Sequence, residues 1–478
     1  MNRFVLATLS ASLMLGGCST LSSLNPFGGD SDEDIREAQG EVAGEDDRIS
    51  ILALDEQLNV GGSIAPGSLV IPEAYVNQDW PQAGGNAVHV MGHTAAAGAL
   101  AKAWDEGVGD SSGRKGRVVA PPVIAQGRIY VMDADNEVRA LDEATGDELF
   151  RVKLTKARGV RKRTAGTRIE DRISNPLSFF ERGGRDKESV GGGVAVGDGR
   201  LYVSSGLGLM GAYDAATGAA IWETPTRTPL HSAPTYADGR VFAISDDNEI
   251  FAFNANSGEV LWTYQGIIEP ARILSAPAPA VFEEVVFAPF SSGEVVALRV
   301  QNGGVLWQDA LTSAGSLTPL SSINDIASGP VVADGFVIAS AQSGNTTAFD
   351  IRTGQRLWSQ PAGMLGYPLV VGDNIFGVTV NGEVVAMSKL DGSVTWLTQL
   401  KSFGNPKKRK DRIAWIGPVL AGGRLVVASS EGRMVTINPQ DGTILEESKV
   451  GDAVFIPPVV ANQTVYMLTD DAKLVAFR

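Results

Sequence analysis

The chain has 478 residues, and 44% of them are hydrophobic, which is enough to build a large core. Its formal net charge of -15 at pH 7 argues against a nucleic-acid partner, because a phosphate backbone favours a basic surface. The single cysteine excludes a disulfide within the chain, so its stability must come from packing.

Residues 1–17 have the pattern of an export signal. One early positive charge, Arg3, precedes an apolar run from Phe4 to Leu15, and small residues follow it. The run is too short for a stable membrane-spanning helix. We therefore expect residues 1–17 to be removed as the protein is exported.

The four residues that end at Cys18, Leu-Gly-Gly-Cys, resemble the lipobox of bacterial lipoproteins. The resemblance implies that Cys18 becomes the acylated N-terminus. Two or more acyl chains anchor a protein stably, so this cysteine would hold the chain at a membrane. Ser19 favours the outer membrane, since an aspartate at that position retains enterobacterial lipoproteins at the inner one. A plain signal peptide with a chance cysteine is the alternative.

Residues 18–48 are acidic, contain glycine and are poor in aromatic residues, which predicts a flexible tether. Residues 49–99 are harder to interpret. Their opening, "ISILALDEQL", is compatible with a strand or a short helix, and Trp80, His89 and His93 follow. We expect this extension to pack along the outside of the repeat structure that comes next.

From Leu100 onward the chain repeats a phrase of the form apolar-Asp-x-x-Thr-Gly-x-x-x-aromatic. Its copies are "ALDEATGDELF", "AYDAATGAAIW", "AFNANSGEVLW", "ALRVQNGGVLW", "AFDIRTGQRLW", "AMSKLDGSVTW" and the degenerate "TINPQDGTILE". Copies are preceded by a matching half, such as "SAPTYADGRVFAISDDNEIFAF". Self-similarity at a fixed period indicates a repeat architecture.

Each unit predicts four short antiparallel strands. Alternating apolar residues form the strands, while Asp-Gly, "SDDN" and the Thr-Gly phrase supply the turns between them. Four strands in about 40 residues make one blade of a β-propeller. The aromatic residue at the end of a unit can fill the wedge between blades, and we assign that docking role to Trp104, Trp222, Trp262, Trp307, Trp358 and Trp396.

The two ends of the repeat region complement each other. The tail from Pro457 to Arg478 stops before its last strand, whereas "LAKAWDEGVG" carries Trp104 with no blade in front of it. We therefore predict that the strand around Trp104 completes the C-terminal blade. This makes residues 100–478 an all-β, eight-bladed β-propeller whose ring closes without an unpaired edge.

Two basic segments interrupt the period. The distance from Phe150 to Trp222 is nearly twice that from Trp222 to Trp262, so we infer an Arg- and Lys-rich insertion at residues 153–189. A shorter run, "NPKKRKDR", separates the sixth and seventh blades. Both lie at inter-blade connections and therefore on one rim. The long insertion could be an ordinary solvated loop, or it could bind a partner, anionic lipid or the cell wall.

The residues offer no catalytic or metal-binding set. His89 and His93 are four positions apart, but the glycines around them predict a loop and no cysteine is left to join them. Aspartates recur at the same blade turn, where they are favoured for backbone reasons. Neither a nucleophile elbow nor a phosphate loop is present in the sequence. We predict no enzyme activity, no metal and no cofactor.

The repeat phrase resembles that of pyrroloquinoline-quinone dehydrogenases, and "NQDWPQAGGN" resembles the opening of such enzymes. That resemblance implies an aspartate base beside a calcium ligand set, and usually a disulfide between adjacent cysteines. The lone cysteine speaks against it. A dehydrogenase is one alternative function, and a wall- or polysaccharide-binding lipoprotein that uses residues 156–187 is another.

A lipobox followed by eight such repeats resembles the BamB family of outer-membrane protein assembly factors, over about residues 100–478. The resemblance implies a lipid-anchored protein of the outer membrane that faces the periplasm. It further implies a scaffold that binds BamA, the barrel-inserting subunit of the β-barrel assembly machinery. Unfolded outer-membrane proteins are possible further partners, which the scaffold would help to insert.

The same resemblance implies a contact surface for that subunit. The family's Arg-x-x-Ser-Ala-Pro loop corresponds to "RILSAP", which places the arginine at Arg272, with Ile267, Ile268 and Ala271 where leucines are expected. One family acid corresponds to Asp325. A second acid is replaced by alanine in this chain.

Overall fold

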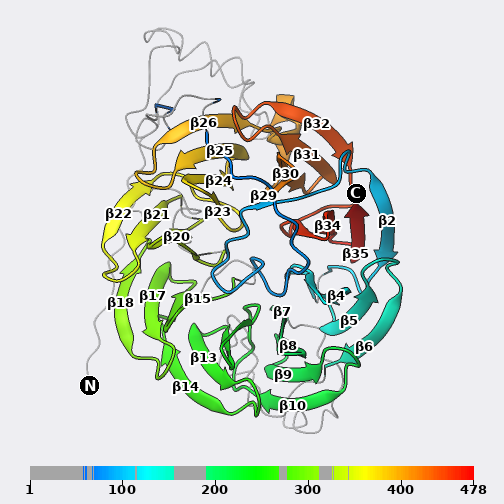
Figure 1. Ribbon diagram of the computed structural model, residues 1–478, viewed down its shortest axis with the longest axis vertical. Coiled ribbons are helices and arrows are strands. Elements are labelled where there is room, and N and C mark those ends of the chain that lie inside the picture. The colour runs from blue at the N-terminus through cyan, green and yellow to red at the C-terminus, as the bar shows by residue number, and fades with distance from the viewer. Residues whose placement is uncertain are drawn as a thin grey trace, which may run out of the picture. The chain divides into compact units, whose positions relative to one another are not determined.

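Eight four-stranded antiparallel sheets stand around a central axis, and each is one blade (Figure 1). The computed structural model describes residues 58, 60–61, 67, 69–113, 116–154, 190–268, 277–311, 326, 328–342 and 344–478. Residues from Leu58 to Arg478 belong to a single compact unit.

The first four blades follow one another along the chain. Blade 1 is β3 (Val123–Ala125), β4 (Arg128–Met132), β5 (Glu137–Asp142) and β6 (Glu148–Lys153). Blade 2 is β7 (Gly192–Gly197), β8 (Arg200–Ser205), β9 (Leu209–Asp214) and β10 (Ala220–Pro225). Blade 3 is β11 (Thr235–Ala237), β12 (Arg240–Ile244), β13 (Glu249–Asn254) and β14 (Val260–Gln265). Blade 4 is β15 (Ala280–Phe282), β16 (Val285–Pro289), β17 (Glu294–Arg299) and β18 (Val305–Ala310).

The remaining blades complete the ring. Blade 5 is β19 (Val331–Ala333), β20 (Phe336–Ser340), β21 (Thr346–Asp350) and β22 (Arg356–Gln360). Blade 6 is β23 (Leu369–Val371), β24 (Asn374–Val378), β25 (Glu383–Ser388) and β26 (Val394–Gln399). Blade 7 is β29 (Trp415–Ala421), β30 (Arg424–Ser429), β31 (Arg433–Ile437) and β32 (Ile444–Lys449), and β1 (His93–Thr94) adds a fifth strand. Blade 8 is β33 (Val459–Ala461), β34 (Thr464–Leu468), β35 (Lys473–Phe477) and β2 (Lys102–Gly107).

The N-terminal strand closes the ring as the sequence predicts. β2 is the outermost strand of blade 8 and pairs antiparallel with β35, so that Trp104 lies opposite Ala476. Blade 8 therefore joins the two ends of the repeat region. The predicted all-β, eight-bladed propeller is confirmed.

Local sequence explains the hairpins inside the blades. The turn between β11 and β12 is Asp238-Gly239, and both residues have positive φ, at 44° and 75°. Two successive positive φ values define the two-residue turn whose twist matches antiparallel strands, and Asp-Gly is among the sequences that adopt it most easily. The Asp-Gly pairs that begin at Asp198 and Asp334 adopt the same conformation.

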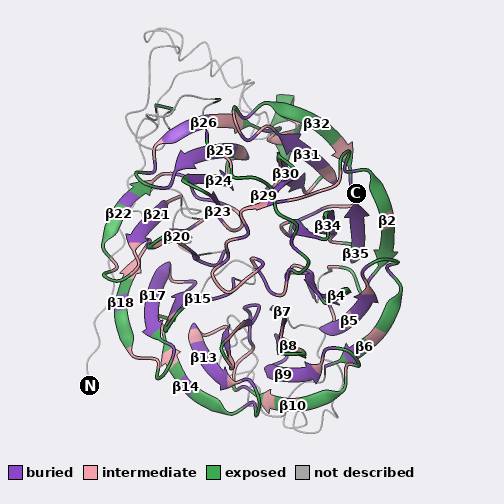
Figure 2. Cartoon of the chain, in the orientation of Figure 1, coloured by how far each residue is buried: buried purple, intermediate pink, exposed green. Residues whose placement is uncertain are grey.

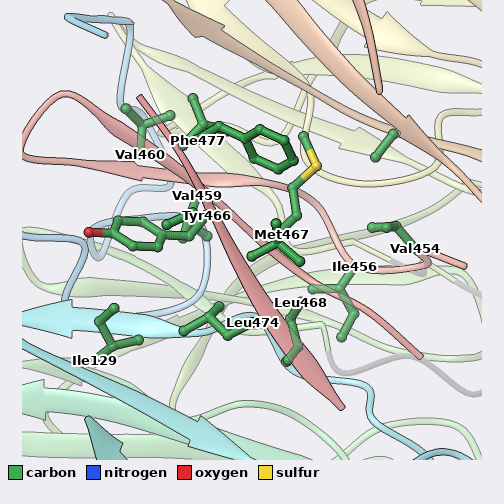
Figure 3. Close-up of a cluster of buried hydrophobic side chains, with 14 of the residues drawn as sticks. Ile129, Val454, Ile456, Val459, Val460, Tyr466, Met467, Leu468, Leu474 and Phe477 are labelled. Carbon is green, nitrogen blue, oxygen red and sulfur yellow. The ribbon is translucent and has the colours of Figure 1, made fainter. Parts of the chain in front are cut away.

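The core lies between blades rather than within one sheet. The inner strands are buried, whereas the outer strands such as β10 and β14 expose most of their residues (Figure 2). Figure 3 shows one cluster at the boundary of blades 8 and 1, where Ile129 lies with Tyr466, Leu474 and Phe477. Burial of this kind on both faces of every blade stabilises the closed ring.

The expectation that the N-terminal extension packs along the outside of the ring was wrong for residues 69–98, although Val60 does pair with Val394 of β26, the outer strand of blade 6. Residues 69–98, which we name the axial segment, lie against the innermost strands and cross the centre of the ring (Figure 1). Its backbone hydrogen bonds to inner strands include Trp80 N to Ile124 O, Val196 N to Pro81 O, Val281 N to Ala87 O and Val332 N to Val88 O. Each blade presents an unpaired inner edge to the axis, and the segment supplies those edges with partners.

The axial segment covers one end of the ring. It bonds to turns that join the first and second strands, as in Gln126 N to Asp79 Oδ1, Gly422 N to Thr94 O and Asn462 N to Asn77 O. Inter-blade connections precede the first strand of a blade and therefore lie at the other end. We name that other end the open end.

Candidate functional site

Two residues of the predicted partner surface, Ile267 and Ile268, lie at the open end, where the connection from blade 3 to blade 4 begins. Ile267 and Ile268 follow β14, and each exposes 60% of its surface. Ala271, Arg272 and Asp325 lie outside the described residues. Large aliphatic side chains this exposed are the type of residue that a partner protein covers.

Two hydrogen bonds hold the backbone of Ile267, at the start of this connection. Asn248 Nδ2 donates to Ile267 O at 2.6 Å, and Ile267 N donates to Glu294 Oε2 at 3.0 Å. Asn248 is fully buried, and its Oδ1 accepts from Ser291 Oγ at 2.9 Å. One amide side chain thus links the turn of blade 3, the turn of blade 4 and the connection between them.

Sequence reasoning missed Asn248, because its stretch "SDDN" was interpreted only as a turn. The repeat itself could have revealed this role, because an asparagine occupies the same position in another blade. The equivalent turn of blade 1 ends at Asn136, whose Oδ1 accepts from Ser205 Oγ of blade 2 at 2.7 Å. Two buried asparagines at one repeat position, each facing a serine of the next blade, indicate an inter-blade contact rather than a solvated turn.

The tryptophans lie at the boundaries between blades. Five donate from Nε1 to a carbonyl of the following blade: Trp222 to Ala255, Trp262 to Val300, Trp307 to Ile351, Trp358 to Lys389 and Trp396 to Pro439, at 2.8–3.0 Å. Trp104 packs against Gly146 of blade 1. Glycine is needed at these turns because a Cβ at Gly303, for example, would lie 2.6 Å from the Trp262 ring.

An axial cavity opens at the open end and reaches down to the axial segment. Its outer chamber holds about 270 Å³ and is lined by Pro121, Ser328, Tyr367, Phe455 and Pro457, among others. A deeper chamber of about 40 Å³ shares Pro121, Tyr367 and Pro457 and ends on Trp80, His89 and Met91. The described lining of both chambers contains no charged residue.

The two histidines of the axial segment are separate and do not form a metal site. His89 is buried, and its Nδ1 lies 2.7 Å from Pro330 O. His93 lies 2.7 Å from Pro72 O through Nδ1 and accepts from Gly423 N through Nε2. Within the described ranges, no group of three His, Cys, Asp or Glu side chains could hold a metal ion. Burial lowers the pKa of His89 to about 4, so its ring is neutral at pH 7.

The short basic run forms a hairpin at the open end. β27 (Phe403–Asn405) and β28 (Lys410–Arg412) pair between blades 6 and 7, with the short 3-10 turn η4 (Pro406–Lys408) between them. The cations Lys407, Lys408, Arg409, Lys410 and Arg412 are all exposed. Of the longer basic insertion, Lys153 belongs to β6, and residues 155–189 lie outside the described residues.

The lipidation residue Cys18 also lies outside the described residues. In the part of the chain that the structure covers, no helix has both the length and the hydrophobicity needed to cross a membrane.

The sequence matches a family model described as outer membrane protein assembly factor BamB over residues 111–185, 174–398 and 400–478. BamB of Yersinia pestis is 27% identical over 378 residues, which covers 79% of this chain and 88% of the relative. BamB of Escherichia coli K12 is 28% identical over 373 residues, which covers 78% of this chain and 87% of the relative.

Two solved structures have the same fold. BamB from Moraxella catarrhalis gives a TM-score of 0.62 at 18% identity and covers 79% of this chain and 99% of its own. A quinohemoprotein alcohol dehydrogenase from Comamonas testosteroni gives a TM-score of 0.60 at 14% identity, and the match covers 84% of this chain and 81% of the dehydrogenase. Identities this low show a common fold alone.

The fold shared with a dehydrogenase raises the question of whether the axis could hold pyrroloquinoline quinone. That cofactor is a polycarboxylate, so its site must offer cations. The described lining of the axial cavity is uncharged and rich in proline, and no metal-binding group lies among the described residues. These residues therefore do not fit the cofactor, and they support no redox step.

Proposed function

Because the chain belongs to the family of the outer membrane protein assembly factor BamB, we propose that it acts as a non-catalytic scaffold of the outer-membrane β-barrel assembly machinery. The observation that carries this proposal is the family match across the whole repeat region. A closed ring with exposed aliphatic residues beside a hydrogen-bonded backbone suits a protein that acts by binding alone.

The proposed partner is the barrel-inserting subunit BamA, bound at the open end. Ile267 and Ile268 supply apolar contact area, and Asn248 and Glu294 fix the backbone that presents them. A residue whose backbone is already held by hydrogen bonds loses little conformational entropy when a partner binds it. Arg272 and Asp325 would add charged contacts, and Ala271 would add apolar contact area.

Unfolded outer-membrane proteins are the proposed second class of partner. Apart from β26, whose Val394 pairs with Val60, the outer strand of each blade has a neighbouring strand on one side only among the described residues, so its other edge can accept an extended chain. Several of these strands expose aliphatic side chains as well: Ile221, Leu261, Leu306, Leu357 and Leu445. Purified protein that failed to crosslink to unfolded barrel proteins would contradict this contact.

Acylation of Cys18 would place the ring at the inner face of the outer membrane, at the end of a tether. Labelling with a radioactive fatty acid tests this, because Cys18→Ala should abolish incorporation and release the chain from the membrane fraction.

The central experiment is purification from native membranes through a C-terminal tag, followed by identification of the proteins that come with it. We expect the barrel-inserting subunit with the wild type, and its loss with Arg272→Glu or with Ile267→Asp/Ile268→Asp. Val70→Asp is the matched control, since Val70 is a 79% exposed aliphatic residue of the axial segment at the opposite end. Absence of a barrel subunit from the wild-type preparation would refute the assembly role.

The basic hairpin β27–β28 favours a second candidate, binding to an anionic cell-wall glycan. Its five exposed cations stand on a chain of net charge -15, so they form a local basic site. A glycan pull-down that is lost when residues 156–187 are deleted, or when the hairpin cations become glutamine, would support this candidate over the scaffold.

A further inference from the structure

One outer blade edge of the ring is already occupied by an extended piece of the chain itself. Val60 pairs parallel with Val394 of β26, and Gly61 N donates to Val394 O at 3.2 Å. Val394 and Thr395 each expose only 2% of their surfaces. Figure 2 shows buried residues on β26, whereas the outer strand β14 is largely exposed. An outer edge of this ring can therefore hold an added extended chain.

The outer strand of blade 3 has the same local structure as β26. Val260 occupies in β14 the repeat position that Val394 occupies in β26, two residues before the docking tryptophan. Gln265 Nε2 donates to carbonyls of the turn between the second and third strands of its blade, and Gln399 Nε2 does the same in blade 6. Val260 is nevertheless 39% exposed, and among the described residues no chain pairs with the outer edge of β14.

Charge distinguishes β14 from the other uncovered outer strands. Charged side chains on an edge strand discourage its pairing with another chain. Six outer strands carry at least one of them: β2, β6, β10, β18, β22 and β32. β14 and β26 carry none. Within the described ranges, β14 is thus the one outer strand that is neither covered nor protected by charge.

Contacts with blade 4 hold β14 in its extended form. Trp262 Nε1 donates to Val300 O at 2.8 Å, and the rings of Tyr264 and Phe290 have centroids 6.2 Å apart. An edge that is already extended and fixed loses little conformational entropy when another strand joins it.

The exposed edge has the length and polarity of one transmembrane β-strand. The stretch from Val260 to Ile268, "VLWTYQGII", has nine residues and no charge. A strand that crosses an outer membrane has about 9–11 residues, and its side chains alternate between apolar and polar. Before insertion its backbone N–H and C=O groups lack strand partners, which an edge strand can supply.

We propose that the outer edge of β14 binds, by strand addition, one transmembrane segment of an unfolded outer-membrane protein. The backbone of that segment pairs with β14, and its apolar side chains lie beside Val260 and Leu261. The source of the segment rests on the proposed assembly function, and the proposal assigns the contact to one blade.

Crosslinking and hydrogen exchange test this site. The purified full chain is mixed with the unfolded barrel domain of an eight-stranded outer-membrane protein, diluted from urea. The photoreactive residue p-benzoylphenylalanine replaces either Thr263 on β14 or Ser359, its counterpart on β22. We expect crosslinking from position 263 only, together with slower amide exchange in β14 when the barrel domain is present.

Three results of this experiment would overturn the proposal. The first is equal crosslinking from both positions, and the second is amide exchange in β14 that the barrel domain does not change. The third is an outer edge of β14 that is already protected from exchange in the free chain, because that edge would then be covered by the chain itself.

A charge variant separates strand addition from nonspecific adsorption. Thr263→Glu gives β14 the residue that blade 2 carries at this position as Glu223, so the ring should still fold. It should weaken binding of the unfolded barrel domain about tenfold, because a charge on the edge opposes pairing. Ser359→Glu is the matched control on β22 and should leave the affinity unchanged. Unchanged affinity of Thr263→Glu, with its fold confirmed by circular dichroism, would contradict the proposal.

The remaining outcomes separate this site from its rivals. A wild-type dimer that Thr263→Glu abolishes would show that a second copy of the chain occupies β14, and it would overturn the proposal. Co-purification of the barrel-inserting subunit from native membranes tests the assembly role separately. Absence of that subunit refutes the assembly role, whereas failed crosslinking at position 263 refutes only the site on β14.

Discussion

The boundary between blades 3 and 4 offers a direct test of how the ring is held together. Trp262 on β14 donates from Nε1 to Val300 O at 2.8 Å, in a buried bond. Phe242 on β12 lies beside it, with ring centroids 5.9 Å apart. Trp262→Phe removes the only donor that the structure gives Val300 O from a side chain, and we expect it to cost about 1–3 kcal/mol of unfolding free energy.

The boundary between blades 1 and 2 shows how this loss can be repaired. Phe150 occupies the tryptophan position there, and Tyr130, which is equivalent to Phe242, donates its hydroxyl to Ala215 O at 2.7 Å. Introducing Phe242→Tyr into the Trp262→Phe variant should recreate this arrangement. Alone, Phe242→Tyr buries a hydroxyl whose acceptor is already taken, so it should destabilise by about 1–3 kcal/mol.

The assay is a double-mutant cycle measured by urea unfolding, followed by far-UV circular dichroism. We expect the double variant to be more stable than the sum of the single effects by about 1–2 kcal/mol. Additive effects, within about 0.5 kcal/mol, would show that the hydrogen bond contributes little and that the aromatic ring acts through packing alone.

Four further changes have outcomes that the structure determines. Gly303→Ala places a Cβ 2.6 Å from the Trp262 ring at a φ of 71°, so it should lower the melting temperature more than Gly239→Ala, where φ is 75° and the space is open. Lys389→Met should leave the protein folded, because its partners Asp334 and Asp373 are exposed and water can hydrate their carboxylates. The double variant Asp334→Asn/Asp373→Asn should instead lower the unfolding free energy by about 3–5 kcal/mol, because it leaves the buried Lys389 cation without a counter-charge. Asn248→Ala should weaken co-purification of the barrel subunit while circular dichroism shows that the ring stays folded. Unchanged co-purification would show that partner binding does not depend on the hydrogen bond from Asn248 to Ile267 O. Burial lowers the pKa of His89 to about 4, so as the pH falls below 6.5 the histidine takes up a proton in the unfolded chain before it does so in the folded one. The unfolding free energy of the wild type should therefore fall by about 2 kcal/mol between pH 7 and pH 5, and His89→Gln should not show this loss.

The repeat made the ring predictable. Each repeat unit encodes alternating strands and tight turns within about 40 residues, and all copies of the phrase but the degenerate seventh end in an aromatic residue, so blade count and closure follow from local patterns. The unmatched strand around Trp104 and the incomplete tail before Arg478 were sufficient to predict how the ring closes, since each lacked what the other supplied.

The path of the axial segment could not be predicted in the same way. Its partners are the backbone edges of the inner strands, and backbone groups leave no pattern in the sequence. Gly84 and Gly85 indicated a loop, but a glycine does not reveal what packs on it. Here these two lie against the side chains of His89 and Met91. Likewise the role of Asn248 depends on Ser291 of the next blade, and the two residues meet only in the assembled ring.

Residues that follow the repeat and residues that break it contribute differently to recognition. Strands, turns and inter-blade contacts recur in every blade, so a surface built from them alone offers a partner several nearly equivalent orientations. A single orientation requires features that occur once, and among the described residues these include the Ile267–Ile268 pair, the β27–β28 hairpin and the axial segment. The first two lie at the open end, and the third forms the floor of the cavity that opens there. Substitutions in the repeat phrase should therefore alter stability before binding, and substitutions at these three features should alter binding first.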